Sequence, residues 1–283
     1  MIDCLIIGKG PAGISCAIYL KRYGFNPVVI GKDGGALENA SSIENYYGIN
    51  QISGKDLVEQ GISQAIKLGI PVFTEEVIDI IKEENFIVTT SQKVYEAKTV
   101  VLACGASRNR YAKADKYEGI SYCATCDGFF YRKKKIALIG NGKYMAHELD
   151  VLGNMCKDIT VFTDGLPLEV SINPSIPVVL DKIISIDGDT HIKMINTMNG
   201  SYAIEGCFIA IGNASGFTLA KHLGIGLNGN AIIVDNDFMT NIDGLYACGD
   251  SIGGLLQVSK AVSDGAGCAT AISKKLKNMK GKA

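Results

Sequence analysis

"DCLIIGKGPAGISCAIYLKRYG", residues 3–24, joins an apolar run, a glycine-rich turn and an amphipathic segment near the start of the 283-residue chain. A second apolar run, "NPVVIG" at 26–31, follows, without the acidic end that often holds a ribose. The order predicts a strand, a turn, a helix and a parallel strand. Glycines in such a turn allow a tight bend and close approach to a pyrophosphate, and the helix N-terminus presents amides to phosphate. The sequence therefore predicts a dinucleotide-binding turn formed by Gly8, Gly10, Pro11, Ala12 and Gly13.

Two segments farther along the chain have features of a flavin-binding domain. "KTVVLACGAS" at 98–107 is a β-type run that ends in a turn at Gly105. "TNIDGLYACGDS" at 240–251 places an apolar strand before Gly249 and Asp250. A carboxylate there accepts hydrogen bonds from the hydroxyls of a ribityl chain, although a Gly-Asp turn is also an ordinary end to a strand. We therefore expect elements of an FAD site near both ends of the chain.

The middle of the chain repeats the strand, glycine turn and helix pattern. "KKIALIGNGKYMAHELDVL" at 134–152 begins the repeat, and "DITVFTD" at 158–164 supplies its next strand. The sequence thus predicts an α/β fold of two nucleotide-binding, Rossmann-like domains, the second inserted into the first. The FAD-binding domain is expected over 1–112 and 213–283, and the inserted, shortened pyridine-nucleotide-like domain over 113–212.

Charge and composition exclude several classes of partner. A net charge of -1 gives no general attraction to nucleic acid or to a membrane surface. The N-terminus lacks the basic flank and cleavage site of a secretory signal, and no apolar run approaches membrane-spanning length. These features predict a cytoplasmic protein with no nucleic-acid or membrane partner, in which most of the nine cysteines are reduced.

Cys123 and Cys126 differ from the other cysteines because they form a Cys-x-x-Cys in "SYCATCDGFF" at 121–130. Two cysteines at this spacing close a small disulfide ring, and a thiolate there attacks the disulfide of another protein. A zinc site would need two more ligands, but no second Cys-x-x-Cys occurs and the three histidines stand alone. The pair therefore favours redox chemistry, no metal is expected, and the seven single cysteines are expected in the core.

Four motifs together resemble the low-molecular-weight thioredoxin reductases. They are Cys-Ala-Thr-Cys-Asp-Gly-Phe-Phe at 123–130, Gly-x-Gly-Pro-Ala-Gly at 8–13, "GGALENASSIENYYGI" at 34–49 and the Gly-Asp element at 249–250. The similarity covers nearly the whole chain in the same order, and the cysteine motif is its most specific part. It implies FAD in the outer domain, a homodimer, thioredoxin as the partner, and rotation of the inserted domain to carry the dithiol between flavin and thioredoxin.

The resemblance also implies roles for individual residues. Cys126 is expected to be the flavin-side thiol, and Cys123 the thiol that attacks thioredoxin. Asp127 is expected to be the acid/base that handles the thiol proton, although an Asp before Gly128 is also typical of a turn. Asn45 is expected near the flavin, and it too is a residue type common in turns.

Three features of the inserted domain depart from the NADPH-dependent members of that family. Met145 stands at the third small position of the second glycine turn, where a long side chain obstructs phosphate. Asp164 and Glu169 lie where those members carry an arginine-rich loop for the 2′-phosphate. Asp164 retains the capacity to accept a hydrogen bond from the ribose of NADH. A helical crossover after this point is disfavoured by Pro167, Pro174 and Pro177.

An intact flavin site and dithiol beside an altered nicotinamide site predict another source of electrons. Reduced ferredoxin is the expected donor, because the chain resembles the ferredoxin-dependent flavin thioredoxin reductases. A ferredoxin near about -400 mV and a thioredoxin near about -270 mV differ by roughly 130 mV, or about 6 kcal/mol for two electrons, so the transfer is downhill.

Two alternatives stay open at this stage. The first is the same reductase fed by NADH, NADPH or a second flavin, and the second is a non-catalytic flavin-binding redox sensor. The basic run "RKKK" at 132–135 offers electrostatic steering to an acidic ferredoxin, although it is more typical of a solvated loop before a strand.

Overall fold

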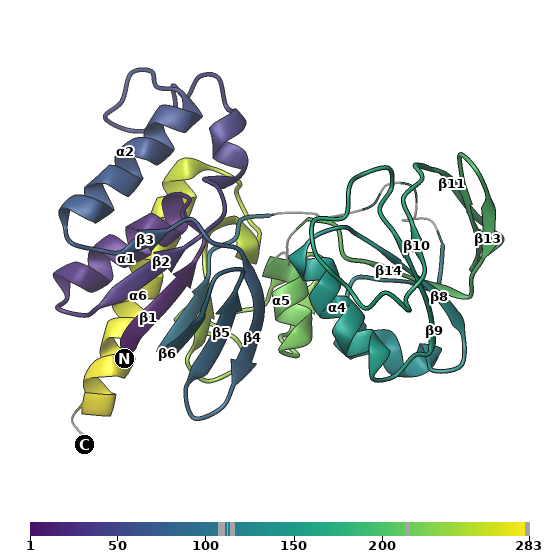
Figure 1. Ribbon diagram of the computed structural model, residues 1–283. Coiled ribbons are helices and arrows are strands. Elements are labelled where there is room, and N and C mark those ends of the chain that lie inside the picture. The colour runs from purple at the N-terminus through teal and green to yellow at the C-terminus, as the bar shows by residue number, and fades with distance from the viewer. Residues whose placement is uncertain (107–110, 112, 114–116, 213–215, 281–283) are drawn as a thin grey trace. The chain divides into compact units, whose positions relative to one another are not determined.

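The computed structural model describes residues 1–106, 111, 113, 117–212 and 216–280. The chain forms two compact units: Met1–Arg108 with Ser215–Ala283, named here the outer unit, and Asn109–Ala214, named here the inserted unit. Each unit contains parallel-paired strands with helices, so the chain has the expected α/β fold of two Rossmann-like units, one inserted into the other (Figure 1). The expected crossing points, Ala112 and Asn213, lie outside the described residues.

The sheet of the outer unit has the strand order β3-β2-β1-β6-β5-β4, with β17 also paired to β6. The N-terminal half of β6 pairs antiparallel with β5, whereas its C-terminal half lies parallel between β1 and β17. Parallel pairing places the carboxyl ends of β1, β6 and β17 at one edge of the sheet, which is where such folds bind ligands. The strands are β1 (Ile2–Ile7), β2 (Pro27–Ile30), β3 (Val72–Phe73), β4 (Val77–Lys82), β5 (Phe86–Thr90), β6 (Val94–Leu102) and β17 (Leu245–Ala247).

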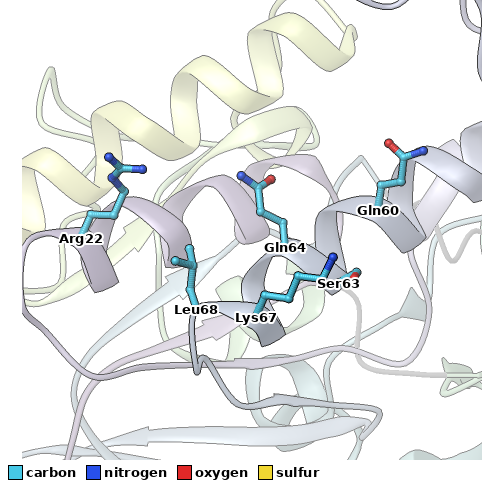
Figure 2. A pocket seen from close by; sticks show the side chains of 6 residues that line it. All are labelled: Arg22, Gln60, Ser63, Gln64, Lys67 and Leu68. Carbon is cyan, nitrogen blue, oxygen red and sulfur yellow. The ribbon is translucent and has the colours of Figure 1, made fainter.

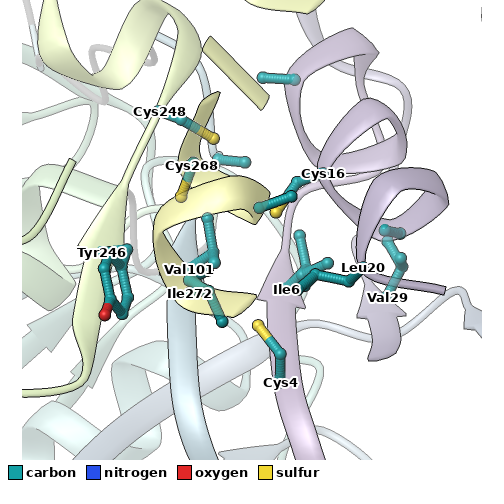
Figure 3. Close-up of a cluster of buried hydrophobic side chains, with 14 of the residues drawn as sticks. Cys4, Ile6, Cys16, Leu20, Val29, Val101, Tyr246, Cys248, Cys268 and Ile272 are labelled. Carbon is teal, nitrogen blue, oxygen red and sulfur yellow. The ribbon is translucent and has the colours of Figure 1, made fainter. Parts of the chain in front are cut away.

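Two helices from opposite ends of the chain pack together in the outer unit. They are α1 (Pro11–Arg22) and α6 (Val258–Lys280), drawn in purple and yellow in Figure 1. Their buried faces form one core with β1, β2, β6 and β17, and Figure 3 shows part of this cluster. The other elements of the unit are η1 (Gly35–Asn39), α2 (Gly54–Lys67), α5 (Gly216–His222), β15 (Leu227–Asn228), β16 (Ala231–Ile232) and η3 (Gly249–Ile252).

Four single cysteines meet in this core: Cys4 on β1, Cys16 on α1, Cys248 after β17 and Cys268 on α6 (Figure 3). Burial raises the pKa of the Cys4 and Cys268 thiols well above the usual value, so these thiols stay protonated and act as apolar packing groups. Six of the seven single cysteines are buried, which confirms the expectation for them, and Cys104 is half-buried.

The inserted unit contains an all-parallel sheet of order β10-β9-β8-β14-β7. The strands are β7 (Ile120–Ser121), β8 (Lys135–Ile139), β9 (Asp158–Phe162), β10 (Val178–Val179) and β14 (Gly206–Ile209). A separate antiparallel sheet consists of β11 (Ile183–Gly188), β12 (Ile192–Thr197) and β13 (Ser201–Ala203). The helical elements are α3 (Ala124–Asp127), η2 (Gly128–Tyr131) and α4 (Lys143–Gly153).

The connection from β9 to β10 is irregular throughout its described residues, 163–177. Pro167, Pro174 and Pro177 lie within it, and proline removes a helical hydrogen bond and clashes with the preceding turn. The expectation that this crossover is not helical is therefore confirmed. Its first part folds back toward the glycine turn that precedes α4, with consequences described below.

Two general features of the described residues concern their helices and their surface. No helix among them is both long and apolar enough to cross a membrane. A shallow depression of about 350 Å³ lies between the end of α1 and α2 (Figure 2). It includes no residue of either glycine turn or of the cysteine pair, and its lining is Arg22, Gln60, Ser63, Gln64, Lys67 and Leu68.

Candidate functional site

The first glycine turn has the tight geometry that its sequence predicts. Gly8 has a φ of +120°, and a Cβ built there would lie 2.2 Å from the carbonyl oxygen of Ala103. A Cβ on Gly13 would lie 1.9 Å from the carbonyl oxygen of Gly8. Neither position therefore accepts a side chain. Gly10 is the N-cap of α1 with extended backbone, and the atom nearest to a Cβ placed on it would be 3.5 Å away, so its side is open for a ligand.

The expected elements from the far end of the chain converge on this turn. Gly249 opens η3 with a φ of +71°, and a Cβ there would lie 2.7 Å from the Cβ of Ala12. The Ser251 hydroxyl donates to the carbonyl oxygen of Gly105 at 3.3 Å. A cavity of about 450 Å³ opens beside Gly10 between α1, α2 and the start of α6. The outer unit thus brings Gly8, Gly10, Pro11, Ala12, Gly13, Gly105, Gly249 and Asp250 into one region.

Asp250 provides the clearest test of whether these residues fit a flavin nucleotide. Its Oδ1 atom is buried and has no hydrogen-bond partner among the described residues. Burial raises the pKa of this carboxyl group, the positive charge of Lys260 opposes the rise, and the negative charge of Asp264 adds to it. A buried acceptor without a partner is costly unless a ligand donates to it. The hydroxyls of a ribityl chain are such donors, so the donor and acceptor chemistry of the region fits FAD.

Lys260 and Asp264 hold the turn that carries Asp250. The Lys260 ammonium group donates to the carbonyl oxygens of Gly249 at 2.9 Å and Gly253 at 2.6 Å, and it pairs with Asp264 at 2.8 Å. The Asp264 carboxylate in turn accepts from the Gly249 amide at 3.2 Å. Sequence reasoning missed both residues, because a Lys and an Asp four residues apart are typical of any solvated helix face.

Asn45 lies close to the start of α6. Its side-chain amide donates to the side-chain carbonyl of Gln257 at 2.9 Å, and Gln257 directly precedes the helix. The contact places Asn45 at a helix N-terminus, which carries partial positive charge and favours electron-rich groups. Asn45 is thus not confined to a local turn.

In the inserted unit, Cys123 and Cys126 form a disulfide with their Cα atoms 5.3 Å apart. Cys123 is the N-cap of α3 and is buried, whereas Cys126 is exposed. The Cys126 amide donates to the Cys123 sulfur at 3.1 Å, so that sulfur lies at the positive end of the helical turn. Such a position favours a thiolate once the disulfide is reduced.

Asp127 contacts the same turn through Ser121. The Ser121 hydroxyl donates to the Asp127 carboxylate at 2.7 Å and accepts from the Cys123 amide at 3.1 Å. The structure therefore brings Cys123, Cys126 and Asp127 together. Ser121 also belongs to this group of residues. The Cys-x-x-Cys motif did not reveal it, because Ser121 lies before the first cysteine.

The second glycine turn, 140–142, differs from the first because its own chain occupies it. The Asn141 side-chain amide donates to the carbonyl oxygen of Pro167 at 3.0 Å and to the Glu169 carboxylate at 3.3 Å, while the Glu169 amide donates to the Asn141 carbonyl at 2.9 Å. A Cβ on Gly142, the N-cap of α4, would lie 3.3 Å from Glu169 Oε2. The Glu169 carboxylate thus lies where a dinucleotide would place its pyrophosphate.

Met145 packs against the first glycine of the same turn. It is fully buried, and a Cβ on Gly140 would lie 2.8 Å from the Cβ of Met145. Its burial shows that the Met145 side chain packs inside the unit, and the expected obstruction of phosphate by Met145 stays a prediction. The position carries an ordinary packing residue rather than the small residue that phosphate contact requires.

Asp164 already uses its acceptor atoms within the chain. Its carboxylate accepts from the Tyr111 hydroxyl at 2.8 Å and from the Ile183 amide at 2.8 Å, and it pairs with Lys113 at 3.3 Å. Burial and the neighbouring Asp164 charge raise the pKa of Tyr111, which keeps its hydroxyl a donor. A ribose hydroxyl would have to displace these partners, so the structure does not support Asp164 as a ribose-binding residue.

Comparison with known proteins agrees with this arrangement. The family model described as pyridine nucleotide-disulphide oxidoreductase matches residues 2–163 and 169–265. A thioredoxin reductase of Helicobacter pylori (strain J99) is 32% identical over 304 residues, which cover 96% of this chain and 98% of that relative. A thioredoxin reductase of Listeria innocua is 29% identical over 287 residues, which cover 93% of this chain and 90% of that relative.

Solved structures give the same result. The atypical thioredoxin reductase TRi from Desulfovibrio vulgaris Hildenborough superposes with a TM-score of 0.87 at 32% identity, over 98% of this chain and 99% of that one. A ferredoxin-flavin thioredoxin reductase from Clostridium acetobutylicum superposes with a TM-score of 0.70 at 29% identity, over 98% of each chain. The chain therefore belongs to the pyridine nucleotide-disulphide oxidoreductase family, in which its homologues are thioredoxin reductases.

Proposed function

We propose that this protein is a ferredoxin-dependent thioredoxin reductase. Electrons pass from reduced ferredoxin through FAD and the Cys123/Cys126 dithiol to the disulfide of thioredoxin. The observation that carries the choice of donor is the contact between Glu169 and the second glycine turn. The family implies a flavin oxidoreductase, and the thioredoxin reductases among its homologues support thioredoxin as the substrate.

The electrostatics of the second glycine turn argue against NADPH and NADH as donors. A pyrophosphate at the N-terminus of α4 would meet the Glu169 carboxylate, and two anions in one site repel each other. The next strand, β9, is followed by Asp164 rather than by a cation that could hold a 2′-phosphate. A ferredoxin needs no nucleotide pocket, and the similarity to a ferredoxin-flavin enzyme supports this donor.

The outer unit is the proposed FAD-binding domain. The amides of the first turn of α1 would hold the pyrophosphate, because Gly8 and Gly13 allow close approach there. Asp250 would accept from the ribityl chain, and Asn45 and Gly105 would lie beside the ring system. When bound, FAD supplies the redox group that takes up electrons and reduces the disulfide.

The inserted unit is the proposed carrier of the exchange step. Two electrons and two protons convert the Cys123–Cys126 disulfide to a dithiol. The Cys123 thiolate then attacks a thioredoxin disulfide, forms a mixed disulfide and releases one thioredoxin thiolate. Cys126 attacks the Cys123 sulfur, restores the internal disulfide and releases reduced thioredoxin. Asp127 takes the proton from the attacking thiol and returns one to a departing thiolate.

This order of attack requires one change in the structure. Cys123 is buried and Cys126 is exposed in the disulfide form, so Cys123 has to become accessible after reduction. Rotation of the inserted unit between flavin and thioredoxin is part of the proposal, as are the homodimer that the family resemblance implies and the cytoplasmic location that the sequence predicts.

The proposal is tested by a thioredoxin thiol assay in which ferredoxin, NADPH and NADH are supplied separately. We expect thioredoxin thiols to appear with reduced ferredoxin and not with either nicotinamide. Cys126→Ser is the control, because it leaves a thiol that forms a mixed disulfide but cannot complete turnover. Turnover with a nicotinamide would contradict the proposed donor, and turnover by Cys126→Ser would contradict the proposed exchange.

A further inference from the structure

The end of β2 in the outer unit lacks the acidic residue that often holds the ribose of a dinucleotide. Gly31 follows β2 directly. The next acid, Asp33, is exposed, and its carboxylate accepts a hydrogen bond from the Gly35 amide at 2.9 Å. The side chain that reaches the end of β2 instead is Lys9, which stands between the first two glycines of the first turn.

The Lys9 side chain crosses the carboxyl ends of β2 and β3. A Cβ built on Gly31 would lie 3.0 Å from the Lys9 amide nitrogen and 3.1 Å from Lys9 Cγ, so the lysine stem occupies the space beside Gly31. The Lys9 ammonium group donates to the Thr74 hydroxyl at 2.8 Å, and Thr74 directly follows β3. The Gly31 amide donates to the carbonyl oxygen of Phe73 at 3.1 Å, which joins the same two strand ends. Lys9 thus carries its charge to the edge of the sheet where folds of this type hold the ribose.

The ammonium group of Lys9 retains donors for a ligand. A lysine ammonium carries three N–H groups, and Thr74 is the one hydrogen-bond partner of Lys9 within the described ranges of the chain. Lys9 also lines the cavity of about 450 Å³ that opens beside Gly10. Ribose hydroxyls accept hydrogen bonds as well as donate them, and a pyrophosphate at the N-terminus of α1 is anionic. The chemistry of Lys9 therefore fits the ribose and pyrophosphate of a dinucleotide.

We propose that Lys9 binds the adenosine ribose and pyrophosphate of FAD in place of the usual acid at the end of β2. The inference rests on the FAD-binding part of the proposed function. An acid there would accept from the ribose hydroxyls and repel the phosphates. Lys9 donates to the ribose oxygens and attracts the phosphates, so the direction of the hydrogen bond and the sign of the charge are both reversed. Gly31 belongs to the arrangement, because a side chain there would displace the lysine stem.

The test measures the affinity of the flavin-free, full-length protein for FAD by flavin fluorescence. Lys9→Met retains an apolar stem over Gly31 but removes the ammonium group. We expect Lys9→Met to weaken FAD binding about tenfold at low salt, and Lys9→Arg, which keeps a charged donor, to stay within about twofold of the wild type. Lys67→Met is the matched control, because it removes the same charge from the exposed end of α2, outside the glycine turn. Its affinity for FAD should be unchanged.

Salt dependence separates the charge of Lys9 from the shape of its side chain. Raising the salt concentration from about 0.05 M to about 0.5 M should weaken FAD binding by the wild type more than by Lys9→Met, because the salt screens the ammonium group. Unchanged FAD affinity in Lys9→Met, or equal losses in Lys9→Met and Lys9→Arg, overturns the role of Lys9. A tenfold loss in Asp33→Asn with none in Lys9→Met would overturn it too, since the acid would then hold the ribose.

The outcomes also separate this inference from the proposed function. The titration needs neither ferredoxin nor thioredoxin, so a protein that binds FAD through Lys9 but does not reduce thioredoxin contradicts the proposed function alone. A wild-type protein that binds no FAD overturns both. Circular dichroism checks the fold of each variant. If Lys9→Met misfolds, Lys9→Gln replaces it, with the same expected loss of affinity and of salt dependence.

Discussion

Asp250 is the single side chain whose surroundings point most directly to a bound ligand. Its Oδ1 atom is buried without a partner among the described residues, and such an unmade hydrogen bond costs about 1–3 kcal/mol. A ribityl hydroxyl would remove this cost. We expect Asp250→Ala to weaken FAD binding about tenfold or more, as measured by flavin fluorescence during titration of the flavin-free protein. Wild-type affinity in this variant would contradict the role given to Asp250.

The raised pKa of Asp250 makes a second prediction for the flavin-free protein. Burial is its main cause. An acid whose pKa is higher in the folded chain contributes stability below its unfolded pKa of about 3.9, and this stability is lost as pH rises through the folded value. We therefore expect the free energy of unfolding, measured with urea, to fall as pH rises through the folded pKa of Asp250. Asp250→Asn should show a smaller decline over the same pH range, and identical pH profiles would contradict the assignment.

At the scale of elements, the contact between η3 and α6 determines the shape of the proposed flavin site. Lys260 holds two carbonyl oxygens of the η3 turn and one carboxylate, all within 2.9 Å. We expect Lys260→Met to lower the free energy of unfolding by about 1–3 kcal/mol and to weaken FAD binding, because Asp250 loses its support. Lys274→Met on the exposed face of α6 is the control, with a change within about 0.5 kcal/mol. Equal effects in the two variants would refute the proposed support.

The closed turn before α4 gives a prediction about the electron donor. Glu169→Ala removes the carboxylate from the helix N-terminus, but Met145 stays buried in the turn and Asp164 stays bound to its three partners. We therefore expect no NADPH-dependent or NADH-dependent flavin reduction in Glu169→Ala. Anaerobic absorbance of the flavin measures it. Prompt reduction by either nucleotide would mean that Glu169 alone keeps the nucleotide site closed.

The sequence predicts correctly those elements whose structure depends on residues that are close together in the chain. Gly13 is required by its contact with Gly8 inside one strand, turn and helix, so the spacing of the two glycines reveals that unit, although Gly8 also meets Ala103 after β6. The irregular crossover follows from its prolines in the same way. The role of Asp164 depends instead on partners 19 to 53 residues away, and no local pattern announces them. Lys260 was missed for the same reason, since it looks like an ordinary helix residue until the fold brings its partners close.

At the scale of the whole molecule, each of the two units carries a glycine turn between a strand and a helix, but the surroundings of the two turns differ. The turn in the outer unit is open beside Gly10 and faces a buried carboxylate oxygen at Asp250 that lacks a partner among the described residues. The turn in the inserted unit is filled by Glu169 and Met145, while the same unit retains the disulfide and Asp127. This contrast is the physical basis for our proposal that the reductase receives its electrons from a donor other than a nicotinamide.

The most direct test of that claim is the anaerobic visible spectrum of the purified flavoprotein with oxidised thioredoxin present. Enzymatically reduced ferredoxin, NADPH and NADH are added in separate cuvettes. We predict that only ferredoxin bleaches the flavin and produces thioredoxin thiols. Prompt bleaching and thiol formation with NADPH or NADH would contradict the account, because they would require a working dinucleotide site at the turn that Glu169 and Met145 close.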